Sequence, residues 1–415
     1  MSRMHTTIRT TLVLGALTAL AACTGDDASK RVLGPQLTGA NAIFQSYVAI
    51  GNSITAGYQS SGISDATQKV AYPLLLAQQM GTRYAYPSLF GVGCPPPVTN
   101  FQTQARPTGT TSTTCLLRNP ASSTDILNNV AVPGASSFDP TDADGTPFSN
   151  TLTSLFLGGK SQVQKALEAS PTFATIWIGN NDVLGFAVQD GRTAALAGMT
   201  SVATFQANYD AMISQLTTGA PGIKGVLIGV VQVANAPIMF PAVALQNPQF
   251  KGGFDAIAGK TTVLDPSCAP GGAGAGSLIN SFLPFQIRLG AHPAIIACVP
   301  GGASGALPAP VGDILVLDPA EQATIQARID AYNSYISAKA ASIDFAYVDP
   351  NALLLTLKAG GTVVRQVPNW AATGTFGTGM SLDGVHPAAG VQREIANALI
   401  AAINAKYGTS LVAVP

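Results

Sequence analysis

The sequence predicts an α/β fold built on a doubly wound sheet of parallel strands. Short apolar runs recur along the chain without the alternation of apolar and polar residues that is typical of half-exposed strands. Continuous runs of this kind fit strands that are buried on both faces of a parallel sheet. Stretches with helical spacing lie between the runs, and this alternation of strand and helix favours a doubly wound sheet.

Four apolar runs are the candidate strands. In chain order they are Tyr47–Ile50, Thr175–Ile178, Val226–Val231 and Phe345–Val348. Each is short enough for a strand, and the first is followed at once by glycine and polar residues, which is where a strand should end.

Four stretches between and after these runs place apolar residues three and four positions apart, as one face of a helix requires. Their apolar stripes are Val163, Ala166 and Leu167; Tyr209, Met212, Ile213 and Leu216; Ile325, Ile329, Tyr332 and Ile336; and Val391, Ile395, Leu399 and Ile403. Pro387 is expected at the start of the last helix and Gly408 at its end.

Two regions interrupt the alternation. Residues 88–125 are rich in Thr, Pro and Ser, and residues 237–312 contain the glycine-rich runs GGAGAG and GGASG with few charges. The second region is expected to be a loop-rich insertion. Its apolar pieces predict either a cover over a site or a subdomain with a small core of its own.

The 415-residue chain has 21 basic and 21 acidic residues, and charged residues make up only 10 % of it. Zero net charge removes the electrostatic case for a nucleic-acid partner. The length suits one large domain or two smaller ones. The sequence gives no indication of an oligomeric state.

The first 22 residues have the features of a secretory signal, with Arg3 and Arg9 ahead of an apolar run too short to span a bilayer comfortably. Cys23 follows Leu-Ala-Ala, which resembles a bacterial lipobox and predicts a lipidated N-terminus; an ordinary signal cleaved near Ala21 or Ala22 is the alternative. Residues 23–42 then form a tether and 43–415 the folded domain. The chain is expected in the cell envelope, as an exported lipoprotein anchored to a membrane.

The cysteines that remain are even in number and contain no C-x-x-C pair, so a zinc or thioredoxin-like site is not indicated. In an exported protein they predict two disulfides. Three connectivities are possible, and the pairs Cys94–Cys115 and Cys268–Cys298 are favoured because each would close a loop-rich region.

Ser53 lies just past the first predicted strand, at the edge where open α/β sheets bind ligands. A helix N-cap is the other interpretation. Among three histidines, His386 stands three residues after Asp383, so that one turn can bring the carboxylate to the imidazole. Serine nucleophiles need such a base and a group that orients it. His292 lies in the insertion with no carboxylate near it in sequence.

Oxyanion donors could come from two turns. Gly134 ends the run Asn129–Gly134 and allows close approach of a backbone N–H, and Asn181 follows the second strand in GNND. Pro-Gly and Asn-Asp are also ordinary turn pairs.

The segments GNSITAG, NNVAVPGA, IGNND and DGVH resemble, in order and placement, the four blocks of the SGNH (GDSL-type) hydrolase family. The resemblance covers essentially the whole domain. It implies a flavodoxin-like three-layer α/β/α fold with a parallel central sheet and loop-rich insertions. It also implies that the chain needs no metal or other cofactor.

By the same resemblance Ser53 is the nucleophile, His386 the base and Asp383 its orienting carboxylate. Ser53, Gly134 and Asn181 would form the oxyanion hole. The family's first block usually has Asp before the serine, whereas this chain has Asn52. We expect the loop geometry to survive this change, although the charge is lost.

The sequence therefore predicts a serine esterase or lipase that hydrolyses acyl esters through an acyl-enzyme, with lipid or fatty acyl esters as substrates. Carbohydrate O-deacetylation is the alternative within the same fold. A non-catalytic binding lipoprotein and a metal-dependent phosphoesterase with Asp383 and His386 as ligands are the alternatives from other classes.

Overall fold

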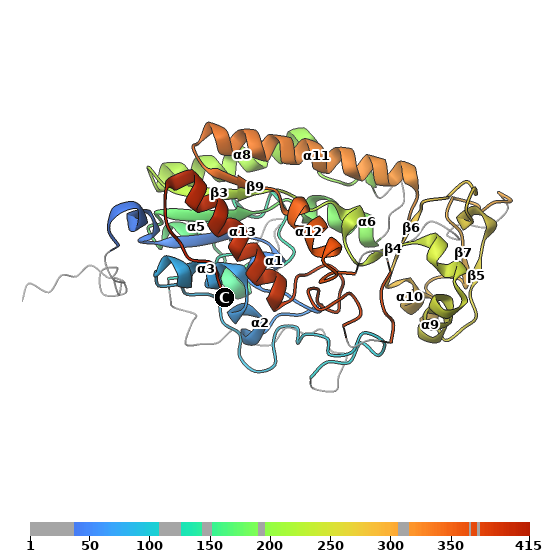
Figure 1. The fold of residues 1–415 in the computed structure, drawn as a ribbon. Coiled ribbons are helices and arrows are strands. Elements are labelled where there is room, and N and C mark those ends of the chain that lie inside the picture. Colours follow the sequence, from blue (N-terminus) through green and yellow to red (C-terminus); the bar gives the residue numbers. More distant parts are fainter. Residues whose placement is uncertain are drawn as a thin grey trace, which may run out of the picture. The chain divides into compact units, whose positions relative to one another are not determined.

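Four parallel strands form the central sheet of the computed structural model, which describes residues 37–107, 126–142, 152–189, 196–305, 315–364, 367–371 and 374–415 (Figure 1). In spatial order they are β1 (Tyr47–Gly51), β2 (Phe173–Trp177), β3 (Lys224–Ile228) and β9 (Ala346–Val348). Tyr47 pairs with Phe173, Phe173 with Lys224, and Val226 with Ala346. The predicted α/β class with a parallel central sheet is confirmed.

A further segment runs along the free edge of β1. Ala49 N–H donates to Asn128 O, and Val130 N–H donates to Ala49 O at 3.0 Å. Val132 N–H donates to Gly51 O. These bonds bring the segment that ends in Gly134 to the carboxyl end of β1, where Ser53 lies.

All residues of β1 and β2 are buried, as continuous apolar runs predict. Successive residues face opposite sides of the sheet: Tyr47 and Ala49 pack in one hydrophobic cluster, and Val48 and Ile50 in the other. The observed β2 and β3 begin two residues earlier than the apolar runs suggest, because Phe173 and Lys224 already pair in the ladder.

Twelve α-helices occur in the described part of the chain. They are α1 (Ser53–Ala56), α2 (Asp65–Lys69), α3 (Tyr72–Met80), α4 (Leu152–Leu157), α5 (Gln162–Leu167), α6 (Asn181–Gln189), α8 (Val202–Gly219), α9 (Pro248–Ala258), α10 (Leu283–Arg288), α11 (Pro319–Ser342), α12 (Pro350–Ala359) and α13 (Ala389–Tyr407). Short 3₁₀ turns are η1 (Gly39–Phe44), η3 (Val233–Asn235), η4 (Ala242–Gln246) and η5 (Pro266–Cys268). The four predicted helices are α5, α8, α11 and α13.

The ends of α11 and α13 illustrate the local chemistry of helix termini, and one prediction about them is wrong. Asp318 caps α11 and forms a capping box with Glu321. Gly408 ends α13 in the left-handed region, as predicted. Pro387, however, lies before the N-cap of α13, which is Ala388, so it is not part of the helix.

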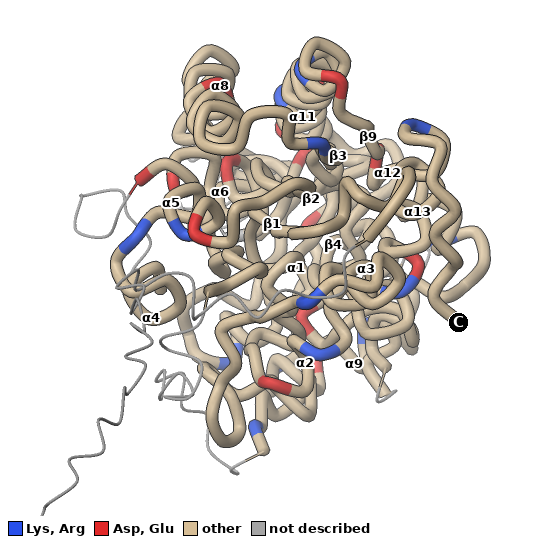
Figure 2. Tube along the Cα trace, turned by 90° about the vertical axis from the view of Figure 1, so that its left-hand side faces the viewer, with Lys and Arg blue, Asp and Glu red and all other residues tan. Residues whose placement is uncertain are grey.

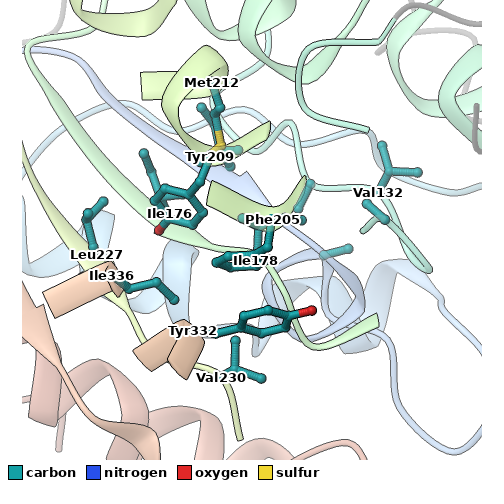
Figure 3. Close-up of a cluster of buried hydrophobic side chains, with 14 of the residues drawn as sticks. Val132, Ile176, Ile178, Phe205, Tyr209, Met212, Leu227, Val230, Tyr332 and Ile336 are labelled. Carbon is teal, nitrogen blue, oxygen red and sulfur yellow. The ribbon is translucent and has the colours of Figure 1, made fainter. Parts of the chain in front are cut away.

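Helices α8 and α11 lie side by side on one face of the sheet, and α3 and α13 pack together on the other (Figure 1). The ring of Phe205 on α8 stacks on Tyr332 of α11 with centroids 3.9 Å apart (Figure 3). Ile336 of α11 and Tyr209 of α8 belong to the same buried cluster. These apolar faces hold the three layers together.

The predicted insertion forms a second sheet between β3 and α11. Its strands are β4 (Met239–Pro241), β6 (Leu278–Asn280) and β8 (Val316–Leu317), and β5 (Val263–Leu264) pairs with β7 (Ile295–Ile296). Strand β8 lies beyond residue 312, the predicted end of the insertion, because it returns to pair with β6. Helices α9 and α10 complete this region.

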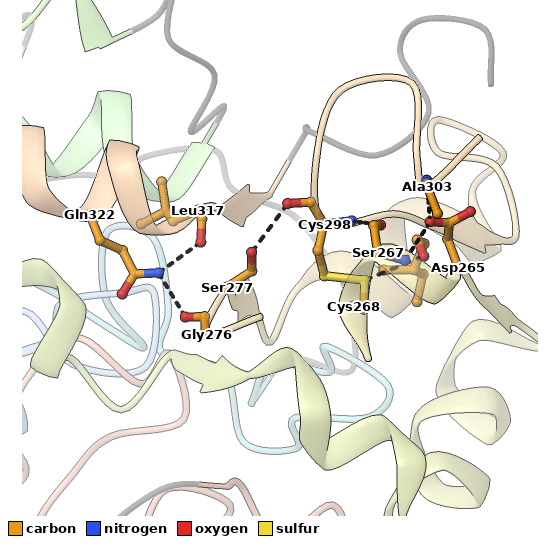
Figure 4. Close-up of a disulfide and its surroundings, with 10 residues drawn as sticks. Asp265, Ser267, Cys268, Gly276, Ser277, Cys298, Ala303, Leu317 and Gln322 are labelled. Atoms are coloured by element: carbon orange, nitrogen blue, oxygen red, sulfur yellow. Dashed lines mark hydrogen bonds between the residues drawn. A yellow bond between two sulfur atoms is a disulfide. The ribbon is translucent and has the colours of Figure 1, made fainter. Parts of the chain in front are cut away.

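The insertion contains the predicted Cys268–Cys298 disulfide, with the two Cα atoms 5.0 Å apart (Figure 4). The Ser267 hydroxyl accepts the N–H of Cys298 at 3.0 Å, and the Ser277 hydroxyl donates to the carbonyl of Cys298. Both sulfur-bearing residues are buried. The bridge therefore ties η5 to the segment after β7.

All described residues belong to one compact unit, Gly34–Pro415. Cys23 and Cys115 lie outside the described residues, as do the predicted signal and most of the tether, so lipidation and the Cys94–Cys115 pairing stay predictions. None of the described helices is both long and apolar enough to cross a membrane. Charged residues of both signs are scattered and interspersed along the trace (Figure 2).

Candidate active site

Ser53 lies at the carboxyl end of β1, as the first residue of the short helix α1. The side chain of Asn52 caps this helix, with Oδ1 accepting the N–H of Ile54 at 3.2 Å. The N–H groups of a first helical turn have no partner within the helix, so the backbone N–H of Ser53 is an available donor. Asn52 thus keeps the turn that sets the serine in place, as the sequence predicts.

A chain of hydrogen bonds joins Ser53, His386 and Asp383. The Oγ of Ser53 lies 2.8 Å from Nε2 of His386, and Nδ1 of His386 lies 2.9 Å from Oδ2 of Asp383. The structure therefore brings together the three residues that the sequence singles out. With Asp383 accepting from Nδ1–H, the other ring nitrogen is free to accept the serine proton.

The carboxylate of Asp383 is held by several donors. Its Oδ1 accepts from the backbone N–H groups of Val385 and His386, and its Oδ2 accepts the N–H of Ser61 at 2.7 Å. Burial alone would raise the pKa of Asp383, but the charge and hydrogen bonds of His386 and the N–H of Ser61 outweigh it and hold that pKa well below its ordinary value. The side chain is therefore an anion that can stabilise an imidazolium.

The turn Ser60–Ser61 supports this carboxylate, and sequence reasoning missed it. Both residues have left-handed φ values, +53° and +52°, which serine adopts rarely. Ser60 N–H donates to the Ser381 hydroxyl, and Leu382 N–H donates to the Ser60 hydroxyl at 3.0 Å. The ring of Tyr58 packs on the imidazole of His386, with centroids 4.9 Å apart.

Gly384 shapes the turn between Asp383 and His386. Its φ is +68°, and a Cβ there would lie 2.9 Å from Cα of Ile238 in the insertion. The N–H of Ile238 donates to the carbonyl of Gly384 at 2.9 Å. The turn that carries the imidazole is therefore packed against the beginning of the insertion.

Asn181 begins helix α6 and lies next to the segment of Gly134. Its Nδ2 donates to the carbonyl of Ala135 at 2.8 Å, which leaves the second hydrogen of the amide available. Gly134 has a φ of +84° and is exposed. The bond between Asn181 and Ala135, with those from β1, holds the two predicted donor segments at one edge of the sheet.

Asp182 ties the same two segments together, and nothing in the sequence beyond its place in GNND indicates this role. Its carboxylate accepts both the N–H and the hydroxyl of Ser137, at 2.8 and 2.6 Å. Burial raises the pKa of Asp182 to about 6, although the hydrogen bonds from Ser137 and Thr200 lower it in part. Asp182 fixes the distance between α6 and the Gly134 turn.

His292 lies near the site but has no hydrogen bond to Ser53. Its Nδ1 is 2.7 Å from the carbonyl of Pro293, and its side chain is buried against the insertion. Within the described ranges, no group of three or more His, Cys, Asp or Glu residues is arranged to hold a metal ion.

The arrangement can perform nucleophilic catalysis. A hydroxyl bonded to an imidazole, whose other nitrogen faces a buried carboxylate, is the pattern of an activated serine. Three N–H groups at the same sheet edge can stabilise a developing negative charge on oxygen.

Comparison with known proteins agrees with this chemistry. The family model described as GDSL-like lipase/acylhydrolase matches residues 47–399. No curated protein sequence gives a significant match.

Several solved structures resemble the chain at low identity. An extracellular lipase from Streptomyces rimosus is 17 % identical, with 87 % of this chain and 99 % of that chain covered and a TM-score of 0.34. Phospholipase A1 from Streptomyces albidoflavus is also 17 % identical, with 87 % and 98 % covered and a TM-score of 0.35. An acetylxylan esterase from Geobacillus stearothermophilus is 10 % identical, with 88 % and 95 % covered and a TM-score of 0.36.

Proposed function

The chain belongs to the GDSL-like lipase/acylhydrolase family and is a hydrolase that acts on esters, and from this premise we propose that it cleaves carboxylic esters through an acyl-enzyme on Ser53. The observation that carries the proposal is the chain of hydrogen bonds from Ser53 Oγ through His386 to Asp383. Each of the three residues has the neighbour that its role requires.

In the first half-reaction, Ser53 Oγ attacks the ester carbonyl carbon while Nε2 of His386 takes the hydroxyl proton. The carbonyl oxygen becomes an oxyanion that accepts from the N–H of Ser53, the N–H of Gly134 and Nδ2 of Asn181. The bond to the alcohol oxygen then breaks, and His386 gives its proton to the leaving alcohol. Asp383 stabilises the imidazolium between these two transfers.

In the second half-reaction, water attacks the acyl carbon and His386 takes the proton of that water. The acid is released and Ser53 Oγ regains a proton from His386. Asn52 is compatible with this cycle because its side chain caps α1 through a neutral oxygen, and no step requires a charge at that position.

Lipid or other fatty acyl esters are the substrates we propose. The support is the apolar insertion, which contacts the turn of His386 directly through Ile238 and Gly384. A series of p-nitrophenyl esters from acetate to palmitate tests this. Preference for acetate alone, combined with release of acetate from a polysaccharide, would favour carbohydrate O-deacetylation instead.

Labelling with a fluorophosphonate tests the nucleophile. We expect the parent protein to be labelled and Ser53→Ala to be neither labelled nor active. Ser214→Ala is the matched control, since Ser214 is exposed on α8, away from the sheet edge that carries Ser53. A parent protein that is folded but neither labelled nor active would favour a binding lipoprotein.

We also propose that the protein is exported and held at a membrane by lipid on Cys23. The support is the sequence alone: Cys23 follows Leu-Ala-Ala after an apolar run. Metabolic labelling with a palmitate analogue should mark the parent protein in its host and not Cys23→Ser. Equal labelling of both would contradict lipidation at this residue.

A further inference from the structure

A cavity of about 530 Å³ lies beside the catalytic residues, between the central sheet and the insertion. Its walls come from four parts of the chain: the segment of Tyr58 and Ser61, the turn of His386, helix α6 and the insertion. The lining residues that matter here are Leu184, Val188, Ile238, Phe282, Val385 and His386. Substrate and cofactor sites commonly have volumes of about 300–1,000 Å³, so this cavity is large enough for a small ligand.

The part of the insertion that lines the cavity is hydrogen-bonded to both the turn of His386 and helix α6. On one side, the N–H of Ile238 donates to the carbonyl of Gly384, between Asp383 and His386. On the other side, Nδ2 of Asn280 on β6 donates to the carbonyl of Val188 on α6. The cavity is therefore bounded by hydrogen-bonded structure on both sides.

Within the insertion, the wall is held by bonds of its own. Ser281 donates to the carbonyl of Ile238 through both its N–H and its hydroxyl, at 2.8 and 2.7 Å. The Oδ1 of Asn280 accepts the N–H of Phe282 at 2.9 Å. These bonds fix the apolar side chains of Ile238 and Phe282 in their places on the wall.

Helix α6 lines the cavity along its length beyond Asn181. Asn181 begins the helix, and Leu184 and Val188 follow on one face, four residues apart. With a rise of 1.5 Å per residue, they lie ~4.5 and ~10.5 Å along the axis from Asn181. The part of α6 that lines the cavity thus lies between about one and two helical turns beyond the proposed oxyanion donor.

The chemistry of the walls favours an uncharged, apolar ligand. No Lys, Arg or Glu is among the described residues that line the cavity, and Asp383 and His386 are already bonded to each other. Two of the polar lining groups are also engaged: Asn280 with Val188 and Phe282, and His292 with Pro293. A phosphate or carboxylate would find no Lys or Arg in this lining.

We propose that this cavity takes an apolar chain of the ester substrate that is longer than acetyl, and that Val188, Ile238 and Phe282 set the length it accepts. This proposal rests on the esterase function proposed above. An acetyl group would occupy only a small part of the volume, and a longer apolar chain would bury its surface against these walls.

Val188→Trp tests the proposal by filling the cavity two turns from Asn181. The bond from Asn280 survives, because it uses the backbone carbonyl of Val188. Two substrate series are measured: p-nitrophenyl esters from acetate to laurate, and acetates of straight-chain alcohols from methanol to decanol. We expect kcat/KM for the long members of one series to fall at least about tenfold, with acetate and methyl acetate within about twofold of the parent.

The series that responds tells whether the chain belongs to the acyl or the alcohol side, and either response supports the cavity assignment. Val188→Ala enlarges the cavity and should move the preferred chain length upward in the same series. Leu289→Trp is the matched control, since Leu289 lies in the insertion but is 74 % exposed and does not line the cavity.

Two failures are distinguishable. If the parent protein hydrolyses neither series, the esterase function is wrong. If it hydrolyses esters but the chain-length profile of Val188→Trp and Val188→Ala is that of the parent, the cavity does not hold the substrate chain.

Discussion

The Nε2 of His386 lies 2.8 Å from the Oγ of Ser53, although 333 residues separate them in the chain. Since no other described base is bonded to this hydroxyl, we predict near-complete loss of ester hydrolysis in His386→Ala. His292→Ala is the comparison: His292 lines the same cavity but bonds to Pro293 and not to Ser53, so hydrolysis of p-nitrophenyl acetate should change little. Initial rates on one p-nitrophenyl ester compare the two variants, and a comparable loss in His292→Ala would mean that the base is wrongly assigned.

Removal of the amide of Asn181 should slow turnover without unfolding the protein. Single oxyanion donors contribute about 10²–10³ in kcat, so Asn181→Ala should lose activity in that range. The loss should fall on kcat more than on KM, because the donor binds charge that develops in the transition state. Steady-state kinetics and a melting curve check this, and activity within twofold of the parent would reject the assignment.

The central sheet could be predicted from sequence because its strands are short continuous apolar runs. Tyr47–Gly51 and Phe173–Trp177 are buried on both faces, which leaves a clear local signal. Ser53, Asp383 and His386 could be singled out because few histidines are available and the four short segments occur in order. Their distances could not be predicted, since they depend on the packing of segments far apart in sequence.

Other features had no local signal at all. The bond between Ile238 and Gly384 joins residues more than a hundred positions apart, and nothing near Ile238 indicates it. The Ser60–Ser61 turn adopts φ values that serine rarely takes, so a sequence pattern argues against it. Strand β8 is only two residues long and exists because β6 offers a partner.

Asn52 stabilises the turn that carries Ser53, so its removal should lower stability. Its side chain is fully buried and caps α1, and loss of such a cap costs about 0.5–2 kcal/mol. We predict that Asn52→Ala lowers the free energy of unfolding by that amount, whereas Asn52→Ser, which also caps well, loses less. Urea denaturation measures both, and equal stability of Asn52→Ala and the parent would contradict the role of the cap.

The Cys268–Cys298 bridge closes a loop of 30 residues in the insertion. A crosslink of that span is worth roughly 3–4 kcal/mol on the chain-entropy model. The double variant Cys268→Ser/Cys298→Ser should therefore unfold at lower urea concentration under oxidising conditions. In the double variant, hydrogen exchange of β5 and β7 should be faster than in the parent protein, whereas exchange of β1 and β2 should change less. Unchanged exchange of β5 and β7 would contradict a stabilising bridge.

Asp182 makes the stability of the fold depend on pH in the weakly acidic range. Burial raises its pKa from 3.8 to about 6, so the folded protein binds this proton more tightly than the unfolded chain does. The stability it contributes is fully present below pH 3.8 and is lost as the pH rises through about 6, a change of about 3 kcal/mol.

Asp182→Asn cannot titrate, so its free energy of unfolding should lack this decline. Urea denaturation of both proteins from pH 4 to pH 8 tests this. The difference between their free energies of unfolding should vary up to about pH 7 and then level off, because Asp182 is only half ionised near pH 6. A constant difference would show that Asp182 is ionised throughout, with its charge already balanced by the two bonds from Ser137.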